Sequence, residues 1–381
     1  MLNHIYKMSN HIYKIINSIK TKKPVLPVIS DLWILNHLSI LQFLMDFSVT
    51  YLLLFVILAA LKSLILILLL LGTIAFYILV ERNILGSIQR RKGPNVIGSY
   101  GLLQSVADGL KLISKETPIP SSSNTSIFLM SPIVSFFIGL GVWGVIPFGE
   151  GAVISNINLG VLYLFALSGI AVFSIIMSGW SSNSKYSFLG AIRSAAQMLS
   201  YEICFGLCLL CVAILTESFN LSEIVYYQQR VMWSFAPLFP IFIIFFISTL
   251  AETNRHPFDL PEAESELVSG FNLEYGAMFF ALFFLGEYAS ILNMCALCVT
   301  LFFGGWDPIF SSLSFIPAPF WFGIKVWILG AFFIIVRGVL PRFRFDQLIA
   351  VGWRVFIPFC VGYVFFIAFF VKFTVDMDGS F

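Results

Sequence analysis

Charge is scarce in this sequence. Lysine, arginine, aspartate and glutamate make up only 11% of the 381 residues, whereas 59% of the residues are hydrophobic and the mean hydropathy is +0.93. Because a soluble domain carries about 25% charged residues, a chain of this composition lacks the polar surface that water requires. The formal net charge of +2 is also too small to indicate a nucleic-acid partner. These shortages exclude an ordinary soluble domain and indicate a membrane protein.

Long apolar runs take the place of the missing polar surface. A membrane-spanning helix needs about 20 apolar residues, and it satisfies its backbone polar groups internally. The runs are too long and too continuous for the alternating strands of a barrel. The sequence therefore predicts an all-α integral membrane protein, a bundle of about eight transmembrane helices. The predicted helices lie near residues 52–80, 127–148, 159–180, 197–216, 235–252, 275–303, 320–340 and 355–375.

Two other segments are distinct from these spans. Residues 1–45 form a basic N-terminal extension with five lysines before its first acid, Asp31. We expect it to be peripheral to a membrane domain that covers residues 46–381. Residues 99–116 place Val106 and Leu110 on one helical face and Asp108 and Lys111 on another. This pattern predicts an amphipathic interfacial helix.

Basic residues are unevenly divided between the loops. The second, fourth and sixth loops contain only Arg230, whereas the first, third, fifth and seventh contain most of the remaining lysines and arginines. Short loops rich in lysine and arginine stay on the cytoplasmic side of a membrane. The odd-numbered loops are therefore expected on that side, which is the matrix in a mitochondrion.

Cysteine is also scarce, and all six cysteines lie in apolar runs. Cys295 and Cys298 form a CxxC pair, and Cys204, Cys208 and Cys211 follow helical spacing. This spacing alone permits a metal or iron–sulfur site. Small apolar side chains packing between helices explain the same pattern, and we predict no metal. Because the sequence also lacks a flavin, dinucleotide or haem motif, no electron-carrying cofactor is expected in this chain.

The most acidic stretch is AETNRHPFDLPEAESELVSGFNLEY, residues 251–275. Carboxylates at membrane depth are costly and usually mark a proton or ligand pathway. Pro257 and Pro261 prevent a regular helix, so we expect this loop to fold back against the bundle. A solvated acidic surface is the alternative, but the interleaved Phe258 and Leu260 favour a packed loop. Crowded carboxylates titrate as a coupled set, and the candidate proton-relay residues are Glu202, Glu252, Asp259, Glu262, Glu264, Glu266, Glu274 and Glu287.

Two basic segments are expected on the same side as this loop. Residues 81–116 hold several arginines and lysines around a Gly93–Pro94–Asn95 turn, and residues 336–347 hold Arg337 and Arg342. Positive-inside anchoring explains part of this charge. The rest is available to pair with the acidic loop or to hydrogen-bond a polar headgroup. Cationic, acidic and aromatic groups above an apolar bundle suit an amphiphile with a polar redox head and a long apolar tail.

These segments resemble the family of subunit 1 of NADH:ubiquinone oxidoreductase, respiratory complex I. The matching stretches are ER-ILG-Q-RKGPN at 81–95, GLLQ-ADG-KL at 101–112, SGWSSNSKYSFLGAIRSAAQMLSYE at 178–202, STLAETNRHPFDLPEAESELVSGFNLEYGAMFFALFFLGEYA at 248–289 and R-PRFRFDQL within 337–348. They cover most of the chain in the family's order. The sequence departs from the family pattern at KETPIP, residues 115–120, where KEP is usual.

The resemblance implies a tunnel through which ubiquinone reaches the junction with the peripheral arm. There, iron–sulfur clusters and a flavin on partner subunits supply the electrons. The positions that match the family's tunnel are Arg82, Arg91, Asp108, Phe280, Phe283, Phe284 and Arg337. The acidic residues named above match its acidic path, with Arg193 and Arg255 as charge partners.

The expected function is that of a core membrane subunit of proton-pumping NADH:ubiquinone oxidoreductase, which couples quinone reduction to proton translocation through buried carboxylates. The expected partners are ubiquinone, lipids and the other membrane-arm and peripheral-arm subunits. The expected location is the mitochondrial inner membrane or, as a second choice, a bacterial plasma membrane. Three alternatives stay open: a proton-conducting subunit of a related membrane-bound hydrogenase or dehydrogenase, an independent secondary transporter, and an inert membrane anchor.

Overall fold

The computed structural model describes residues 29–259, 269–309 and 315–378. The chain divides into two compact units, the first ending at Leu61 and the second beginning at Lys62. Among the described residues, the first unit contains only the start of helix α2 (Ile29–Ile88). The second unit contains the rest of α2 and all the helices that follow. The bundle described below belongs to the second unit.

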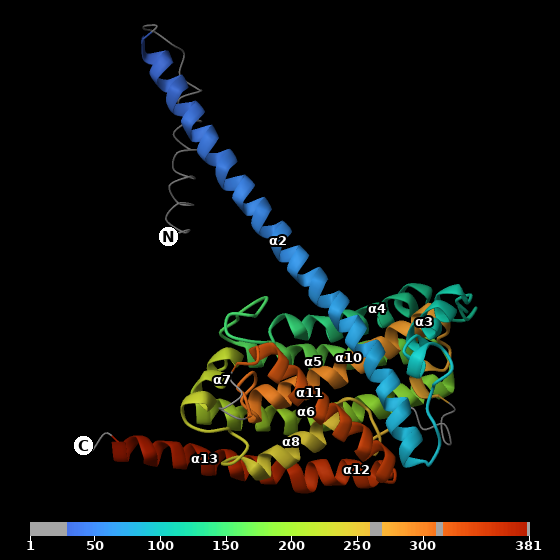
Figure 1. The fold of residues 1–381 in the computed structure, drawn as a ribbon. Coiled ribbons are helices and arrows are strands. Elements are labelled where there is room, and N and C mark those ends of the chain that lie inside the picture. The colour runs from blue at the N-terminus through green and yellow to red at the C-terminus, as the bar shows by residue number, and fades with distance from the viewer. Residues whose placement is uncertain (1–28, 260–268, 310–314, 379–381) are drawn as a thin grey trace. The chain divides into compact units, whose positions relative to one another are not determined.

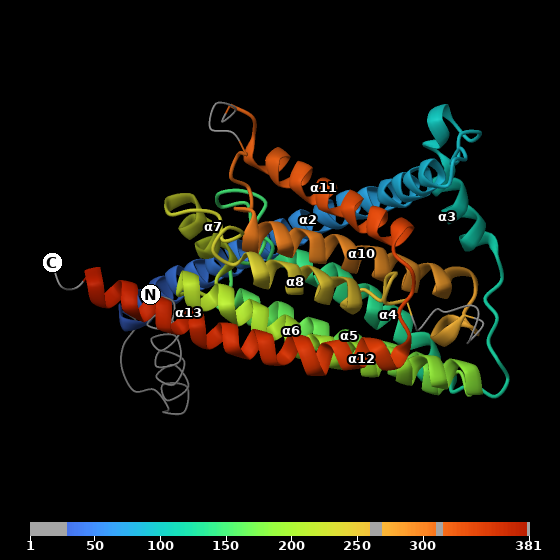
Figure 2. The same cartoon turned by 90° about the horizontal axis from the view of Figure 1, so that it is seen from below.

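This bundle consists of long helices that run side by side (Figures 1 and 2). Helix α10 packs against α4 and α11, α5 lies between α4 and α6, and α6 packs against α8 and α13. A short π-helical turn, Gly352–Phe356, joins α12 to α13. The helices after α2 are α3 (Gln104–Ser114), α4 (Thr125–Gly141), α5 (Gly160–Ser181), α6 (Lys185–Thr216), α7 (Leu221–Arg230), α8 (Phe239–Glu252), α10 (Ala277–Phe302), α11 (Ala318–Val339), α12 (Phe345–Val351) and α13 (Ile357–Asp378).

The prediction of an all-α membrane protein is confirmed. Within the described residues, seven helices are long and apolar enough to cross a membrane. The predicted span at 235–252 is found as the shorter apolar helix Phe239–Glu252. The predicted interfacial helix is found as α3, none of whose residues is buried, and its apolar side chains Val106 and Leu110 are more than half exposed. An exposed apolar face of this kind suits the membrane interface.

Two helices extend beyond the predicted spans because polar residues find partners at their ends. Helix α2 continues to Ile88, past Glu81 and Arg82, whose side chains form ion pairs with other elements. Helix α6 begins at Lys185, and the side chain of Ser184 caps it by accepting a hydrogen bond from the Ser187 amide at 3.4 Å. Hydropathy marks the apolar part of a helix and not its polar turns.

The six cysteines are all buried free thiols. Cys208 on α6 lies 3.9 Å from Cys360 on α13, measured between the sulfur atoms, and Cys295 and Cys298 lie in the core on α10. These positions agree with the expectation that small apolar side chains pack between the helices.

The segments that follow α2, α5, α8 and α11 lie at one end of the bundle. The amide of Asn124 donates to the Ser181 carbonyl at 3.0 Å, and the amide of Phe343 donates to the Pro257 carbonyl at 3.3 Å. Helix α7 lies at the opposite end (Figures 1 and 2). The fold therefore brings the acidic loop and both basic segments together. Which side of the membrane this end faces stays a prediction.

At the opposite end, one buried lysine holds a loop in place. Lys325 of α11 is only 5% exposed, and its Nζ donates to the carbonyls of Phe303, Gly305 and Asp307 at 2.6, 3.1 and 2.6 Å. The ammonium also lies 4.7 Å from the ring centre of Trp233. A buried charge is tolerated when it is fully hydrogen-bonded in this way.

We predict that Lys325→Met destabilises the protein, because it leaves these carbonyls without their donor at about 1–3 kcal/mol for each unsatisfied group. The measurement is the temperature at which the assembled, detergent-solubilised complex loses its structure. Lys372→Met, at an exposed position on α13, is the matched control. An equal transition temperature for the two variants would contradict this role of Lys325.

Candidate functional site

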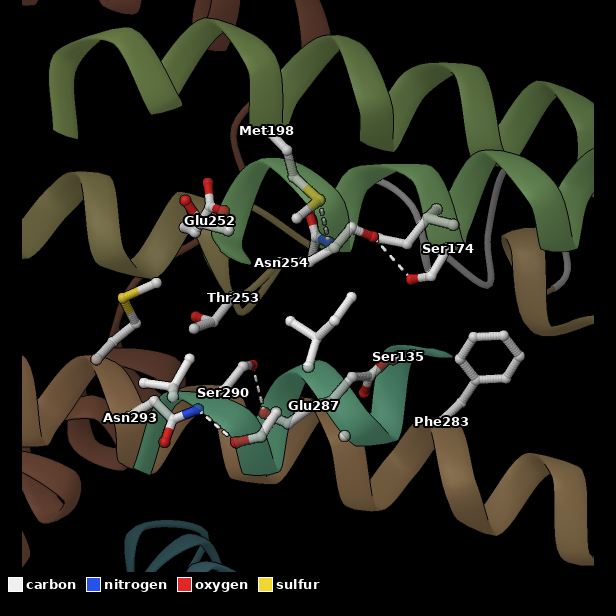
Figure 3. Close-up of a pocket in the computed structure, with 18 of the residues that line it drawn as sticks. Ser135, Ser174, Met198, Glu252, Thr253, Asn254, Phe283, Glu287, Ser290 and Asn293 are labelled. Carbon is white, nitrogen blue, oxygen red and sulfur yellow. Dashed lines mark hydrogen bonds between the residues drawn. The ribbon is translucent and has the colours of Figure 1, made fainter. Parts of the chain in front are cut away.

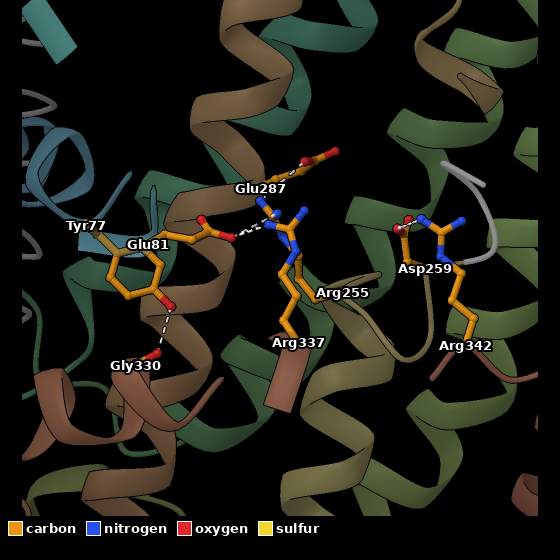
Figure 4. A network of polar contacts seen from close by, with 8 residues as sticks. All are labelled: Tyr77, Glu81, Arg255, Asp259, Glu287, Gly330, Arg337 and Arg342. Carbon is orange, nitrogen blue, oxygen red and sulfur yellow. Dashed lines mark hydrogen bonds and ion pairs between the residues drawn. The ribbon is translucent and has the colours of Figure 1, made fainter. Parts of the chain in front are cut away.

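Four charged side chains meet at the end of the bundle that carries the basic segments; we call Glu81, Arg255, Glu287 and Arg337 the charged cluster (Figure 4). Glu81 is 5% exposed and forms an ion pair with Arg337. Arg255 lies 3.9 Å from Glu81 through Nη1 and 3.9 Å from Glu287 through Nη2. The four side chains come from α2, α10, α11 and the segment after α8. Each carboxylate in this apolar setting therefore has a cationic neighbour, as buried charges require.

Aromatic rings support the charged cluster from the bundle side. The guanidinium carbon of Arg255 lies 4.5 Å from the ring centre of Tyr288, a cation–π distance. The ring of Tyr288 lies 6.0 Å from that of Tyr77. The hydroxyl of Tyr77 donates to the Gly330 carbonyl at 3.0 Å, which ties α2 to α11 beneath the cluster (Figure 4). The cluster is thus held by packing as well as by charge.

A partly polar cavity of about 90 Å³ lies beside the cluster, between α4, α5, α6, α10 and the end of α8 (Figure 3). Glu252 and Glu287 both line it. Glu252 Oε2 and Asn293 Oδ1 are buried and have no hydrogen-bond partner among the described residues. A cavity of this size with several polar groups can hold water molecules. Its other polar lining residues are Ser135, Ser168, Ser174, Thr253, Asn254 and Ser290.

Glu287 belongs to both the charged cluster and the cavity. Its carboxylate lies beside Arg255 and it also lines the cavity with Glu252. Glu252 in turn interacts electrostatically with Glu202 of α6, which lines a second hollow next to Trp353. The predicted relay residues Glu287, Glu252 and Glu202 therefore follow one another from the cluster into the bundle.

The structure separates the predicted tunnel residues into groups. Arg82 and Asp108 form an ion pair at 2.8 Å that joins α2 to α3, with both side chains at least one third exposed. The rings of Phe280 and Phe284 lie 5.4 Å apart on one face of α10. Phe283 lies elsewhere, in a separate buried core cluster.

Phe283 packs against Phe271 and Tyr275 at ring distances of 5.6 and 5.0 Å and lines the 90 Å³ cavity. Phe284 instead continues towards Tyr288, at 5.0 Å. Arg91 is exposed after the end of α2. The tunnel positions are therefore not contiguous in this chain.

The remaining predicted relay residues lie at the edge of this region. Asp259 pairs with Arg342 at 3.2 Å (Figure 4). Glu274 is half-buried just before α10, and Arg193 is half-buried on α6. Glu262, Glu264 and Glu266 lie outside the described residues.

Glu81 is the residue that the sequence prediction missed. The predicted span ended at 80, which placed Glu81 in a loop, but α2 continues to Ile88 and buries it. An acid followed directly by Arg82 at the end of a long apolar run was the available signal. Tyr77 and Tyr288 were also missed, because a tyrosine in an apolar run resembles ordinary core.

The charged cluster is closely packed. The hollow lined by Tyr77, Glu81, Arg255 and Arg337 holds only about 10 Å³, which is less than the volume of one aromatic ring. A ligand headgroup therefore binds beside the cluster or displaces one of its side chains.

Comparison with known proteins agrees with this arrangement. A family model described as NADH dehydrogenase matches residues 61–368. The chain belongs to this family. It is 55% identical over 309 residues to NADH-ubiquinone oxidoreductase chain 1 of Chondrus crispus, covering 81% of this chain and 94% of that protein.

Plant and bacterial relatives match as well. The chain is 55% identical over 298 residues to NADH-ubiquinone oxidoreductase chain 1 of Arabidopsis thaliana, covering 78% of this chain and 91% of the relative. It is 52% identical over 304 residues to an NADH-quinone oxidoreductase subunit from Rhodospirillum rubrum, covering 79% of this chain and 90% of the relative. The resemblance noted from the sequence motifs is confirmed.

We predict strong energetic coupling between Glu81 and Arg337. In a double-mutant cycle of Glu81→Gln and Arg337→Gln, the coupling measured by thermal stability of the solubilised complex is expected at about 1–3 kcal/mol, because each single variant leaves a buried charge. The exposed pair Arg344 and Asp346 is the control, with an expected coupling of about 0–1 kcal/mol. Equal coupling in the two cycles would show that burial adds nothing.

We also predict a contribution of His256 to the pH dependence of stability. Burial, with help from Arg342 and Arg337, lowers the pKa of His256 below its ordinary value of 6.5. The folded chain therefore resists a proton that the unfolded chain accepts, so stability is complete above pH 6.5 and is lost as the pH falls towards the folded-state pKa.

The measurement is the transition temperature of the complex at about pH 7.5 and about pH 5.5. His256→Gln is expected to lose less stability on acidification than the parent protein. An identical loss in both proteins would rule out the contribution of His256.

Proposed function

We propose that this chain is the quinone-site membrane subunit of a proton-pumping NADH:quinone oxidoreductase. Its relatives carry the names of subunits of such an enzyme. The observation that carries the proposal is the double position of Glu287, which contacts the charged cluster and lines the carboxylate cavity. A change of charge on one side of Glu287 is therefore felt on the other.

The charged cluster supplies the response to quinone reduction. A quinone headgroup bound beside Arg337 gains negative charge as it accepts electrons, and it then competes with Glu81 for the guanidinium. In a setting of low dielectric constant such a change in pairing is worth several kcal/mol, on the order of that of a buried ion pair. Glu81 then relies on Arg255, whose hold on Glu287 weakens in turn. Glu287 exchanges a proton with the cavity as a result.

The carboxylates beyond the cluster carry the proton. Water in the 90 Å³ cavity connects Glu287 with Glu252, and Glu202 extends the path into the bundle. Asp259, Glu274 and the loop acids Glu262, Glu264 and Glu266 connect the path to the aqueous side. Arg193 and Arg255 balance the charge of this acidic path.

The tunnel and the partners complete the proposal. Arg82, Arg91 and Asp108 border the approach of the headgroup, and Phe280 and Phe284 border the approach of the isoprenoid tail, with Phe283 behind them. Ubiquinone is the substrate, and electrons reach it from iron–sulfur clusters and a flavin on partner subunits. The membrane is the mitochondrial inner membrane or a bacterial plasma membrane, and the segments after α2, α5, α8 and α11 face the matrix or cytoplasm.

We predict that Glu252→Gln lowers NADH:ubiquinone turnover by about tenfold or more, because a relay group that no longer accepts a proton removes a proton-transfer step. Turnover and proton uptake are measured on the assembled enzyme in liposomes. Oxidation of NADH by a water-soluble artificial acceptor is expected to be unchanged, since that reaction does not need this chain.

Glu150→Gln, at an exposed position in the loop before α5, is the matched control and is expected to pump normally. If Glu252→Gln turns over and pumps like the parent enzyme, Glu252 is not part of the proton path.

A further inference from the structure

A second, apolar groove lies in the bundle, away from the charged cluster. It measures about 400 Å³ and is formed by α2, α10, α11 and the segment at the end of α4, a volume within the range of ligand pockets. Its floor and walls are almost entirely apolar. Its lining residues include Leu66, Leu69, Leu292, Phe322, Val326 and Trp327.

The groove opens where α2 and α11 diverge. Gly330 and Gly323 lie two turns apart on the same face of α11. A methyl group added at Gly330 would come within 2.9 Å of the Tyr77 ring, whereas one added at Gly323 would meet nothing within 4 Å. The contacts between Tyr77 and Trp327, 5.9 Å between ring centres, close the inner end. The two helices therefore touch near the charged cluster and part towards the opposite membrane surface.

The depth of the groove corresponds to one leaflet of a bilayer. Lys62, at its outer end, lies twenty positions before Arg82, which is about 30 Å of helix and about the thickness of the hydrocarbon core. Lys62 is therefore at the membrane surface opposite the basic segments. From Lys62 to Thr73 the lining of α2 runs about 16 Å inwards, roughly half of that core.

Polarity changes along the groove from the outer to the inner end. The outer end holds the exposed ammonium of Lys62 and the indole of Trp143. Trp143 is 4% exposed, and its Nε1–H is buried without a hydrogen-bond partner among the described residues. At the inner end the one hydroxyl, that of Thr73, is already donated to the Leu70 carbonyl at 2.8 Å. A ligand that fits therefore has a polar, anionic outer part and an apolar inner end.

We propose that this groove binds one phospholipid of the leaflet opposite the basic segments. An acyl chain lies between α2 and α11, the phosphate lies at Lys62, and an ester carbonyl accepts the hydrogen bond of Trp143. A helix of another subunit, about 10 Å wide and spanning both leaflets, does not fit a groove that closes halfway. A quinone lacks the anionic headgroup that Lys62 suits. The inference goes beyond the proposed function and holds without it.

Photolabelling of the assembled complex tests the proposal. A phosphatidylglycerol with a diazirine at the end of one acyl chain is added to the solubilised complex and photolysed, and labelled peptides are identified by mass spectrometry. We expect label on the lining of α2 and α11 near Leu69 and Trp327, removed by excess unlabelled phosphatidylglycerol. Label that is absent there, or that excess lipid does not remove, overturns the proposal, as does a chemical cross-link from this lining to another subunit.

Two variants and a control make the test specific. Gly323→Leu fills the groove without a clash and is expected to reduce the label by about tenfold, and Lys62→Gln is expected to weaken competition by anionic lipid. Gly362→Leu adds the same side chain at another open glycine, on α13, and is expected to leave the label unchanged. Equal labelling of the two leucine variants overturns the proposal. If Gly323→Leu does not assemble, saturable labelling and competition in the parent complex decide the question.

Discussion

Everything at the functional end of this bundle depends on how a few charges are kept in an apolar interior. Glu81 is the centre of that arrangement, because it is the carboxylate that both Arg255 and Arg337 approach. Each of these groups is costly to bury alone and tolerable only with the others. Four separate segments must therefore come together before any one of them is stable, and the same requirement places the acidic loop against the basic ends of α2 and α11.

The bundle treats its two ends differently. At the cluster end, charges pair with charges, so that a change in one affects its neighbours. At the opposite end, Lys325 is satisfied by three backbone carbonyls, an arrangement that fixes a loop and passes nothing on. The apolar groove opens towards that second end. Coupling and anchoring are thus separated along the membrane normal.

Much of the fold follows from the sequence, since apolar runs of sufficient length have no other stable form in a membrane. The predicted span 159–180 differs from α5, Gly160–Ser181, by one residue at each end. The polar first turns of α6 could not be predicted in this way, because Ser187 and Gln197 are buried by tertiary hydrogen bonds to Phe271 and Phe258. The site shows the same division: the acids stand out in the sequence, whereas the pairing of Glu81 across 256 positions to Arg337 depends on the fold.

Helix α10 joins all the parts of the site in one rigid element. It carries Phe280 and Phe284 on one face, Phe283 against the cavity, and Glu287 between cavity and cluster. Each inserted or deleted residue would rotate everything beyond it by about 100° and move it by about 1.5 Å. Side chains on this helix are therefore free to vary within their chemistry, but its length is not. Across the family, insertions and deletions in this stretch should be far rarer than substitutions.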